Sequence, residues 1–231
     1  MSKIKLNSVI NKDNFTDYVR EKYDLKVDNE IITEVPMIDA SKLDTFNWNI
    51  GVICGNSGSG KSTILKSLGE PKNAQYDYSK CIISQFQNMS EHDACELLCS
   101  VGLSSVPIWL HKPNELSNGE KARLDLCSIL ANAKNNEIIL FDEFSSVVNR
   151  PCAKSMSFAL QRYIREKNLK IILASCHFDI IEWLNPDWVF NLNKQVNGEC
   201  EIEKLIYKND EKYVIYNSIN KDSILSKEYQ L

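Results

Sequence analysis

Residues 48–68 read WNIGVICGNSGSGKSTILKSL, and this stretch decides the fold of the 231-residue chain. The apolar run 48–54 predicts a buried strand, 55–60 a glycine-rich loop, and 61–68 a short helix ended by Gly69. Glycines let the loop wrap so that successive backbone N–H groups point inward at an anion, and the helix start adds its positive dipole end. The pattern G-x-x-x-x-G-K-[ST] in this context therefore predicts a site for the phosphates of a nucleotide.

The side chains of this loop have defined expected roles. Lys61 would reach the β- and γ-phosphates as a mobile positive charge, and the Ser62 hydroxyl would bind Mg²⁺. The residues expected to bind the nucleotide are Gly55, Asn56, Ser57, Gly58, Ser59, Gly60, Lys61, Ser62 and Thr63.

A second half of the site is predicted at 137–143, EIILFDE, where an apolar strand runs into two adjacent carboxylates. Asp142 would hold Mg²⁺ through water. Glu143 would polarise the attacking water as a general base. A phosphate loop requires an acidic metal ligand of this kind, so the two stretches support each other.

The rest of the chain predicts an α/β architecture. Further strands are expected at 81–84, 170–174 and 187–192, and helices at 91–101, 118–133 and 152–167; a helix at 14–23 and a strand near 30–37 precede them. Because the strands are apolar runs rather than alternating patterns, we expect a parallel sheet covered on both faces.

The sequence pattern changes beyond residue 199. EIEKLIY and KYVIY, on either side of Asn209-Asp210, predict an antiparallel hairpin. We therefore divide the chain into a domain at 1–198 and a hairpin appendage at 199–231.

Composition excludes several classes of protein. With 43% hydrophobic residues and a net charge of −4, the chain is neither disordered nor collagen-like, and it lacks the basic character of a dedicated nucleic-acid binder. A basic group on the predicted helix end (Arg162, Arg165, Lys167 and Lys170) leaves a nucleic-acid partner open without supporting it. The sequence shows no signal peptide, no apolar run of about 18 residues and no zinc spacing among its eight cysteines, so we expect a cytoplasmic location without a membrane span.

Residues 116–120, LSNGE, resemble the LSGGQ signature of ABC-type ATPases. Other motifs of that family then follow in order: Gln85 resembles the Q-loop glutamine, 146–149 (SVVN) resembles the D-loop, and His177 resembles the switch histidine. The resemblance covers about residues 46–192. It implies a P-loop NTPase fold, an ABC-type nucleotide-binding domain with a reduced helical subdomain and a C-terminal β-hairpin.

The resemblance also implies an activity and an assembly. ATP would be bound with Mg²⁺ and hydrolysed at a head-to-tail dimer interface, where Ser117 and Gly119 of one subunit cap the γ-phosphate held by another. Gln85 would contact the metal and the attacking water, and His177 would hydrogen-bond the γ-phosphate. Since the chain carries one set of motifs, a homodimer is the simplest assembly.

Departures from the family refine the expectation. The stretch from Lys61 to Leu116 is shorter than in transporter ATPases, and there is no coiled-coil insert. The stretches 142–150, 175–179 and 182–188 resemble bacterial and phage-type ABC ATPases, some of which are joined to a GNAT acetyltransferase domain. The expected function is a soluble, non-transporter ATPase that switches an unknown protein partner.

Alternatives remain open at this point. They are an ATP-gated regulatory, nucleic-acid-processing or defence subunit with little turnover, a transporter ATPase subunit, and a P-loop kinase. Preference for ATP over GTP comes only from the resemblance, because no aromatic residue stands at the usual adenine-stacking position. Arg150 reads equally well as a residue that reaches across a dimer interface and as a surface arginine.

Overall fold

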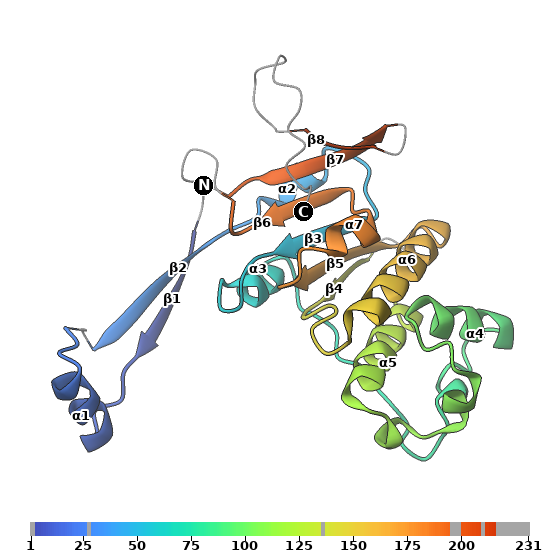
Figure 1. Ribbon diagram of the computed structural model, residues 1–231, viewed down its shortest axis with the longest axis horizontal. Coiled ribbons are helices and arrows are strands. Elements are labelled where there is room, and N and C mark those ends of the chain that lie inside the picture. The colour runs from blue at the N-terminus through green and yellow to red at the C-terminus, as the bar shows by residue number, and fades with distance from the viewer. Residues whose placement is uncertain (1–2, 27–28, 135–136, 195–199, 209–210, 216–231) are drawn as a thin grey trace.

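A computed structural model describes residues 3–26, 29–134, 137–194, 200–208 and 211–215. Its main sheet has the strand order β4-β5-β3-β6-β7-β8 (Figure 1). The parallel strands are β3 (Ile50–Cys54), β4 (Ile138–Phe141), β5 (Lys170–Ser175) and β6 (Trp188–Asn191). Strand β3 lies at the centre and is fully buried, as its apolar run predicts. The α/β fold with a parallel sheet expected from the sequence is therefore confirmed.

Helices cover both faces of this sheet. Side chains of β3 alternate between two apolar clusters: Val52 packs with the helical layer, and Ile53 packs with the helix of the phosphate loop. The helical layer consists of α4 (Glu91–Ser100), α5 (Asn118–Ala131), α6 (Arg150–Glu166) and α7 (Ile180–Leu184), and the opposite face carries α3 (Lys61–Ser67) and α2 (Ala40–Leu43). Both faces are thus removed from water, which is what a parallel sheet of apolar strands requires.

The predicted hairpin extends the main sheet at its edge. Strand β7 (Ile202–Lys208) pairs antiparallel with β6 and with β8 (Glu211–Ile215). Asn209 and Asp210, the predicted turn, lie outside the described residues, and the domain boundary at 198/199 stays a prediction.

The strand predicted at 81–84 is wrong. Ile83–Gln85 form a 3₁₀ turn (η1), with two further turns at Val106–Leu110 (η2) and Pro113–Glu115 (η3). The amide of Ile82 donates to the carbonyl of His111 at 2.9 Å, and the Ile82 side chain is buried in the helical layer. Ile82 is buried here because the chain turns inward, and no strand of the described residues pairs with this segment.

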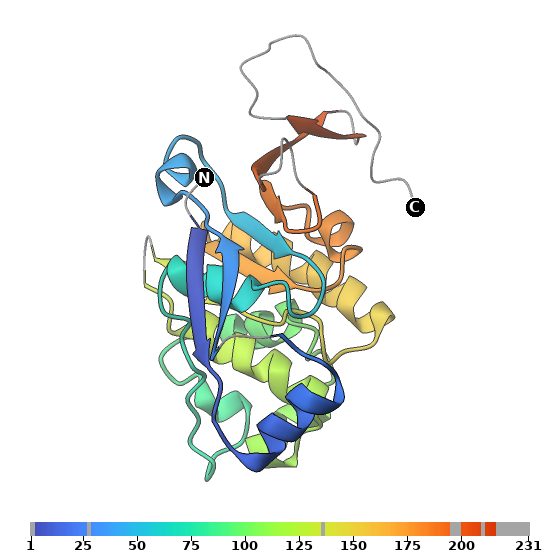
Figure 2. The ribbon, with the colours of Figure 1, turned by 90° about the vertical axis from the view of Figure 1, so that its left-hand side faces the viewer.

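Residues 3–26 and 29–36 form an arm that extends from the main body in Figure 1 and faces the viewer in Figure 2. Strands β1 (Lys3–Val9) and β2 (Glu30–Pro36) pair antiparallel, and α1 (Asn14–Lys22) lies at the far end. The α1 helix begins at a capping box in which Asp13 accepts from the Thr16 amide at 2.9 Å. The helix predicted at 14–23 and the strand near 30–37 are confirmed, whereas β1 was not anticipated.

None of the helices in the described ranges has the length and apolar character needed to cross a bilayer.

A close contact explains the glycine in the central strand. A Cβ atom at Gly51 would lie 2.0 Å from the ring of Trp188, which is fully buried and packs edge-on against Trp48 at 5.6 Å. Strand β3 therefore accepts β6 at this register only because residue 51 has no side chain.

We predict that Gly51→Ala lowers the free energy of unfolding by about 1–3 kcal/mol, because the buried ring has no room to move. Urea denaturation measures the change. In a Trp188→Leu background the same substitution should lower the free energy of unfolding by a markedly smaller amount. An equal loss in both backgrounds would contradict the contact as the cause.

Candidate functional site

The three motif-bearing loops converge because of strand pairing. Strand β5 lies between β3 and β4, with Cys54 opposite Ser175 and Phe141 opposite Leu173. The phosphate loop follows β3, the acidic pair follows β4 and His177 follows β5. The carboxyl ends of parallel strands meet at one edge of the sheet, where α/β proteins bind ligands.

The phosphate loop holds its own lysine. The Lys61 ammonium donates to the carbonyl oxygens of Gly55 at 2.9 Å and Asn56 at 2.7 Å. Gly60 caps the start of α3 with φ +92°, and a Cβ there would lie 2.6 Å from Val35 at the root of the arm. A glycine is required at position 60 both by conformation and by space.

Several loop residues remain open to a ligand. Asn56, Ser57, Gly58 and Ser62 are exposed, and Thr63 is half-buried. The hydroxyl oxygen of Ser59 is buried and has no hydrogen-bond partner among the described residues. A buried hydroxyl normally finds a partner, so an oxygen-rich ligand in the loop fits this position.

A residue from β6's end supports the loop. The Asn193 amide donates to the Asn56 side-chain oxygen at 2.9 Å, and the Asn56 N–H donates to the Asn193 side-chain oxygen at 3.3 Å. This reciprocal pair joins residues 137 positions apart. No local sequence pattern indicates this pair.

The acidic pair sits on a strained turn. Glu143 has φ 53° and Ser145 has φ 67°. The Asp142 carboxylate stabilises the turn, because it accepts a hydrogen bond from the Glu143 amide at 2.8 Å. The Phe144 amide donates to the Ala174 carbonyl at 2.8 Å, which ties the turn to β5. Left-handed backbone at non-glycine residues persists only where surrounding contacts hold it, and it is common at functional sites.

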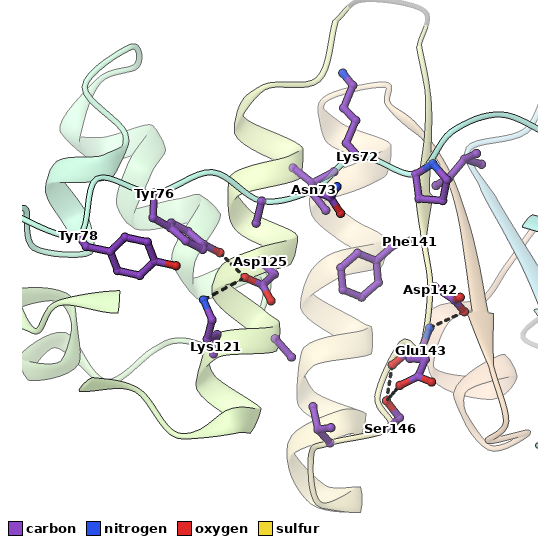
Figure 3. A pocket seen from close by; sticks show the side chains of 16 residues that line it. Lys72, Asn73, Tyr76, Tyr78, Lys121, Asp125, Phe141, Asp142, Glu143 and Ser146 are labelled. Carbon is purple, nitrogen blue, oxygen red and sulfur yellow. Dashed lines mark hydrogen bonds and ion pairs between the residues drawn. The ribbon is translucent and has the colours of Figure 1, made fainter. Parts of the chain in front are cut away.

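Both acids line a cavity of about 480 Å³ (Figure 3). Its opposite wall carries Tyr76, whose hydroxyl donates to Asp125 at 2.6 Å, and Lys121, whose ammonium lies 4.6 Å from the Tyr76 ring centroid. Burial and the neighbouring Asp125 raise the pKa of Tyr76. The sequence analysis does not identify this cluster. The one available signal is the spacing of Lys121 and Asp125, which are four residues apart on α5 and form an ion pair on one face of the helix.

The signature residues begin α5. Ser117 is the N-cap, and its hydroxyl donates to the Glu120 carboxylate at 2.6 Å while its amide donates to the same oxygen at 2.9 Å. These bonds lower the pKa of Glu120. A Cβ at Gly119 would lie 3.0 Å from the Val147 carbonyl, so this helix start also packs on the D-loop of its own chain. The carboxylate of Glu120 thus takes the anion-binding position at the helix start.

His177 is held beside the acidic turn. Its Nδ1 lies 3.2 Å from the Ser145 hydroxyl oxygen. Burial of the ring, followed by the charge of Arg150, lowers the pKa of His177, and Asp179 opposes them. Arg150 forms a bidentate ion pair with Asp179 inside the chain and lies 5.0 Å from the Trp183 ring, so its charge is neutralised in cis.

The structure does not bring Gln85 to Asp142. The Gln85 side-chain oxygen accepts from the Asp77 amide at 2.9 Å, and its nitrogen donates to the Asp77 carbonyl at 2.8 Å. Gln85 lines a separate cavity of about 310 Å³ with Phe86 and other residues. Its predicted role at the metal would require these bonds to break.

The donor set fits Mg²⁺ rather than a dedicated metal cage. Among the described residues no group of three or more His, Cys, Asp or Glu side chains could hold a metal ion. Mg²⁺ is usually held by one or two protein oxygens together with waters and substrate phosphates. The Ser62 hydroxyl and the Asp142 carboxylate are oxygens of that kind.

Comparison with known proteins gives distant relatives. No family model matches the chain. The energy-coupling factor transporter ATP-binding protein EcfA1 of Staphylococcus aureus is 26% identical over 182 residues, covering 62% of this chain and 66% of that protein. The methionine import ATP-binding protein MetN 2 of Acinetobacter baylyi is 33% identical over 70 residues, covering 30% of this chain and 20% of that protein.

Solved structures that resemble the chain include ABC transporter cassettes. The match to EcfA1 spans slightly less than two thirds of that relative's length. The dimeric structure of MJ0796, titled a bacterial ABC transporter cassette, aligns with a TM-score of 0.49 at 16% identity, covering 79% of this chain and 94% of that chain. The chain itself brings the phosphate loop, the acidic pair and His177 to one edge of the sheet, and residues 116–120 lie at the start of α5.

We predict that Asn193→Ala weakens Mg-ATP binding by about fivefold, the loss expected for one or two hydrogen bonds that position the phosphate loop. A fluorescent ATP analogue titrated into the protein measures the dissociation constant. Asn132→Ala is the matched control, because its amide donates to Ser128 at 2.7 Å away from the loop. Equal affinities for the wild type and Asn193→Ala would show that the pair does not position the loop.

Proposed function

We propose that the protein is an ATPase that binds and hydrolyses Mg-ATP at the interface of a head-to-tail homodimer. The observation that carries the proposal is the convergence of the phosphate loop, Asp142–Glu143 and His177 at the carboxyl ends of β3, β4 and β5. These groups supply a phosphate cradle, a metal ligand with a general base, and a neutral hydrogen-bond donor.

The roles of the residues follow from their chemistry. Lys61 exchanges its two loop carbonyls for β- and γ-phosphate oxygens, and backbone N–H groups of residues 55–63 cradle the phosphates. Ser62 and Asp142 would hold Mg²⁺, which neutralises charge on the phosphates when it is bound. Glu143 takes a proton from the attacking water, and His177 donates to the γ-phosphate.

A second copy of the chain completes the site. None of residues 55–63 lines the cavity beneath α5, whereas the α5 start presents an N-terminus with Ser117 and Gly119. Such a helix start stabilises an anion, and a γ-phosphate is the anion that the site would offer. In a symmetric pair, each signature caps the nucleotide of the other copy.

The output of the site is a switch. Intact triphosphate joins the two copies and hydrolysis releases them, so dimer closure reports the nucleotide state to a protein partner. Between α3 and α5 the chain forms one helix, α4, and the three short turns η1, η2 and η3. This region is shorter than the helical region expected of a transporter ATPase, which favours a non-transporter role. No disulfide joins any of the eight cysteines, all of which lie in the described residues, and this is consistent with a location in the cytoplasm.

A second candidate is an ATP-binding subunit of a transporter. The names of EcfA1 and MetN 2 favour it. Fractionation of cells that express the tagged chain distinguishes the two. Recovery in the membrane fraction with an integral membrane protein in fixed stoichiometry supports the transporter, and a stable homodimer in the supernatant supports the switch.

We predict that Glu143→Gln lowers phosphate release at least about 100-fold, because the general base is removed, and traps a dimer with Mg-ATP. Phosphate release and light scattering after gel filtration measure the two effects. Glu166→Gln, at the exposed end of α6, is the control and should leave both unchanged. Unchanged turnover in Glu143→Gln would refute its assignment as the base.

Replacing Glu120 tests the signature. Glutamine keeps the capping geometry of α5 and removes one negative charge from the surface that the opposing γ-phosphate must approach. In the Glu143→Gln background we predict that Glu120→Gln lowers the ATP concentration for half-maximal dimerisation by about two- to fivefold, as a charge near a helix start permits.

The effect of Glu120→Gln should shrink at high salt, since exposed charges are screened there. Light scattering over an ATP titration at low and high salt measures it. Dimerisation that is insensitive to the charge at position 120 would contradict the placement of the signature against a phosphate.

A further inference from the structure

Hydrogen bonds through the Ser175 hydroxyl connect the backbone of His177 to the acidic turn. The Ser175 hydroxyl donates to the Phe144 carbonyl at 2.8 Å, and the same oxygen accepts from the His177 amide at 3.1 Å. The Phe144 amide in turn donates to the Ala174 carbonyl. These hydrogen bonds join the loop after β5 to the turn after β4 and so position the backbone of His177 relative to Glu143.

Ser145 links the histidine ring to Arg150. Its hydroxyl oxygen lies 3.2 Å from His177 Nδ1 and accepts from Arg150 Nη1 at 3.4 Å. Ser145 is only 5% exposed, and no other partner of its hydroxyl is recorded among the described residues. Because arginine only donates, the single hydroxyl hydrogen of Ser145 is left for His177 Nδ1.

The direction of this bond sets the tautomer. If Nδ1 carried the proton, the buried hydroxyl hydrogen of Ser145 would have no acceptor, and a buried unmade bond is unfavourable. Nδ1 is therefore the acceptor, and the proton of the neutral ring resides on Nε2. No hydrogen bond to Nε2 is recorded within the described part of the chain, so this N–H is free to donate.

Arg150 is itself held in a fixed geometry. It is the first residue of α6, after the N-cap Asn149, and its Nε and Nη2 both donate to the carboxylate of Asp179. The centroid of the Trp183 ring lies 5.0 Å from the guanidinium carbon of Arg150. The planar guanidinium presents its donors as a rigid fork, so two bonds to Asp179 aim the third donor at Ser145.

We propose that Ser145 and Arg150 are positioning residues that hold His177 as its Nε2–H tautomer, with that N–H available to the γ-phosphate. The inference rests on the proposed function, because it concerns the same switch histidine. It goes further by naming a relay, Asp179–Arg150–Ser145–His177, that no sequence motif identified.

The charges around the ring support a neutral histidine. The charged groups that act on it are Arg150 from α6 and Asp179 from its own loop. Burial and Arg150 lower the pKa of His177 and Asp179 raises it. Removing the charge of Arg150 takes away a lowering influence and leaves Asp179 unpaired, so both effects raise the pKa of His177.

The test is a long-range ¹H–¹⁵N correlation spectrum of the full nucleotide-free chain at neutral pH. The sequence contains three histidines, and His177→Gln identifies the signal of His177. The proposal expects a protonated Nε2 and an unprotonated Nδ1. Since no nucleotide is present, the result holds even if the chain did not hydrolyse ATP, and absent turnover would then count against the proposed function alone.

Variants separate positioning from folding. Ser145→Gly removes the hydroxyl and tolerates φ 67°, and Arg150→Gln removes the fork; each should give a mixed tautomer signal and roughly 10- to 100-fold slower ATP turnover. Arg150→Gln should also raise the pKa of His177 in an NMR titration. Arg150→Lys keeps the charge without the fork, so it should preserve the lowered pKa and still mix the tautomers.

Lys154→Gln is the matched control. This cation lies on the same helix, 5.9 Å from the Trp183 ring, and makes no recorded contact with His177. In this variant the tautomer of His177, the pKa of His177 and the rate of ATP turnover should equal those of the wild type. A protonated Nδ1 in the wild type, or an unchanged tautomer in both Ser145→Gly and Arg150→Gln, would overturn the proposal.

Discussion

The parallel pairing of β4 with β5 and of β5 with β3 is the constraint on which the site depends. Each of the three strands ends in a different chemical group, and only their neighbouring register brings those groups together. Gly51 permits the close packing of Trp188 across β3 that completes this arrangement. The strained turn after β4 is stable because the Phe144 amide and carbonyl are both bonded to the end of β5. The fold therefore bears the strain at Glu143 and Ser145 through long-range contacts.

Three polar side chains of the site are bonded within their own chain. Lys61 is held by loop carbonyls, Glu120 occupies the anion position at the start of α5, and Gln85 is bound to the 77–81 segment. Buried or partly buried polar groups without partners are unfavourable, so this arrangement stabilises the protein before a nucleotide enters. Ligand contacts made by these three side chains would replace internal bonds, which links nucleotide binding to a change in their positions.

Local patterns predicted what local physics determines. The strands predicted at 48–54, 137–141, 170–174 and 187–192 are confirmed, because burial of apolar runs acts within a few residues. The strand at 81–84 was wrong, since Ile82 is buried by the helical layer and not by a sheet. Asn193 and the Arg150–Asp179 pair could not be predicted, because their partners are far away in sequence. The same holds for the amide bonds of Gln85, which follow from the turn that replaced the predicted strand.

The central claim is that two copies of the chain enclose nucleotide between them. A structure of the Glu143→Gln protein with Mg-ATP tests it most directly, through the distance from the Ser117 hydroxyl of each copy to the γ-phosphate bound by the other. The account predicts hydrogen-bond contact, at about 3 Å, in both halves of a symmetric dimer. A monomer with bound Mg-ATP, or a dimer in which Ser117 lies beyond reach of either γ-phosphate, would contradict it.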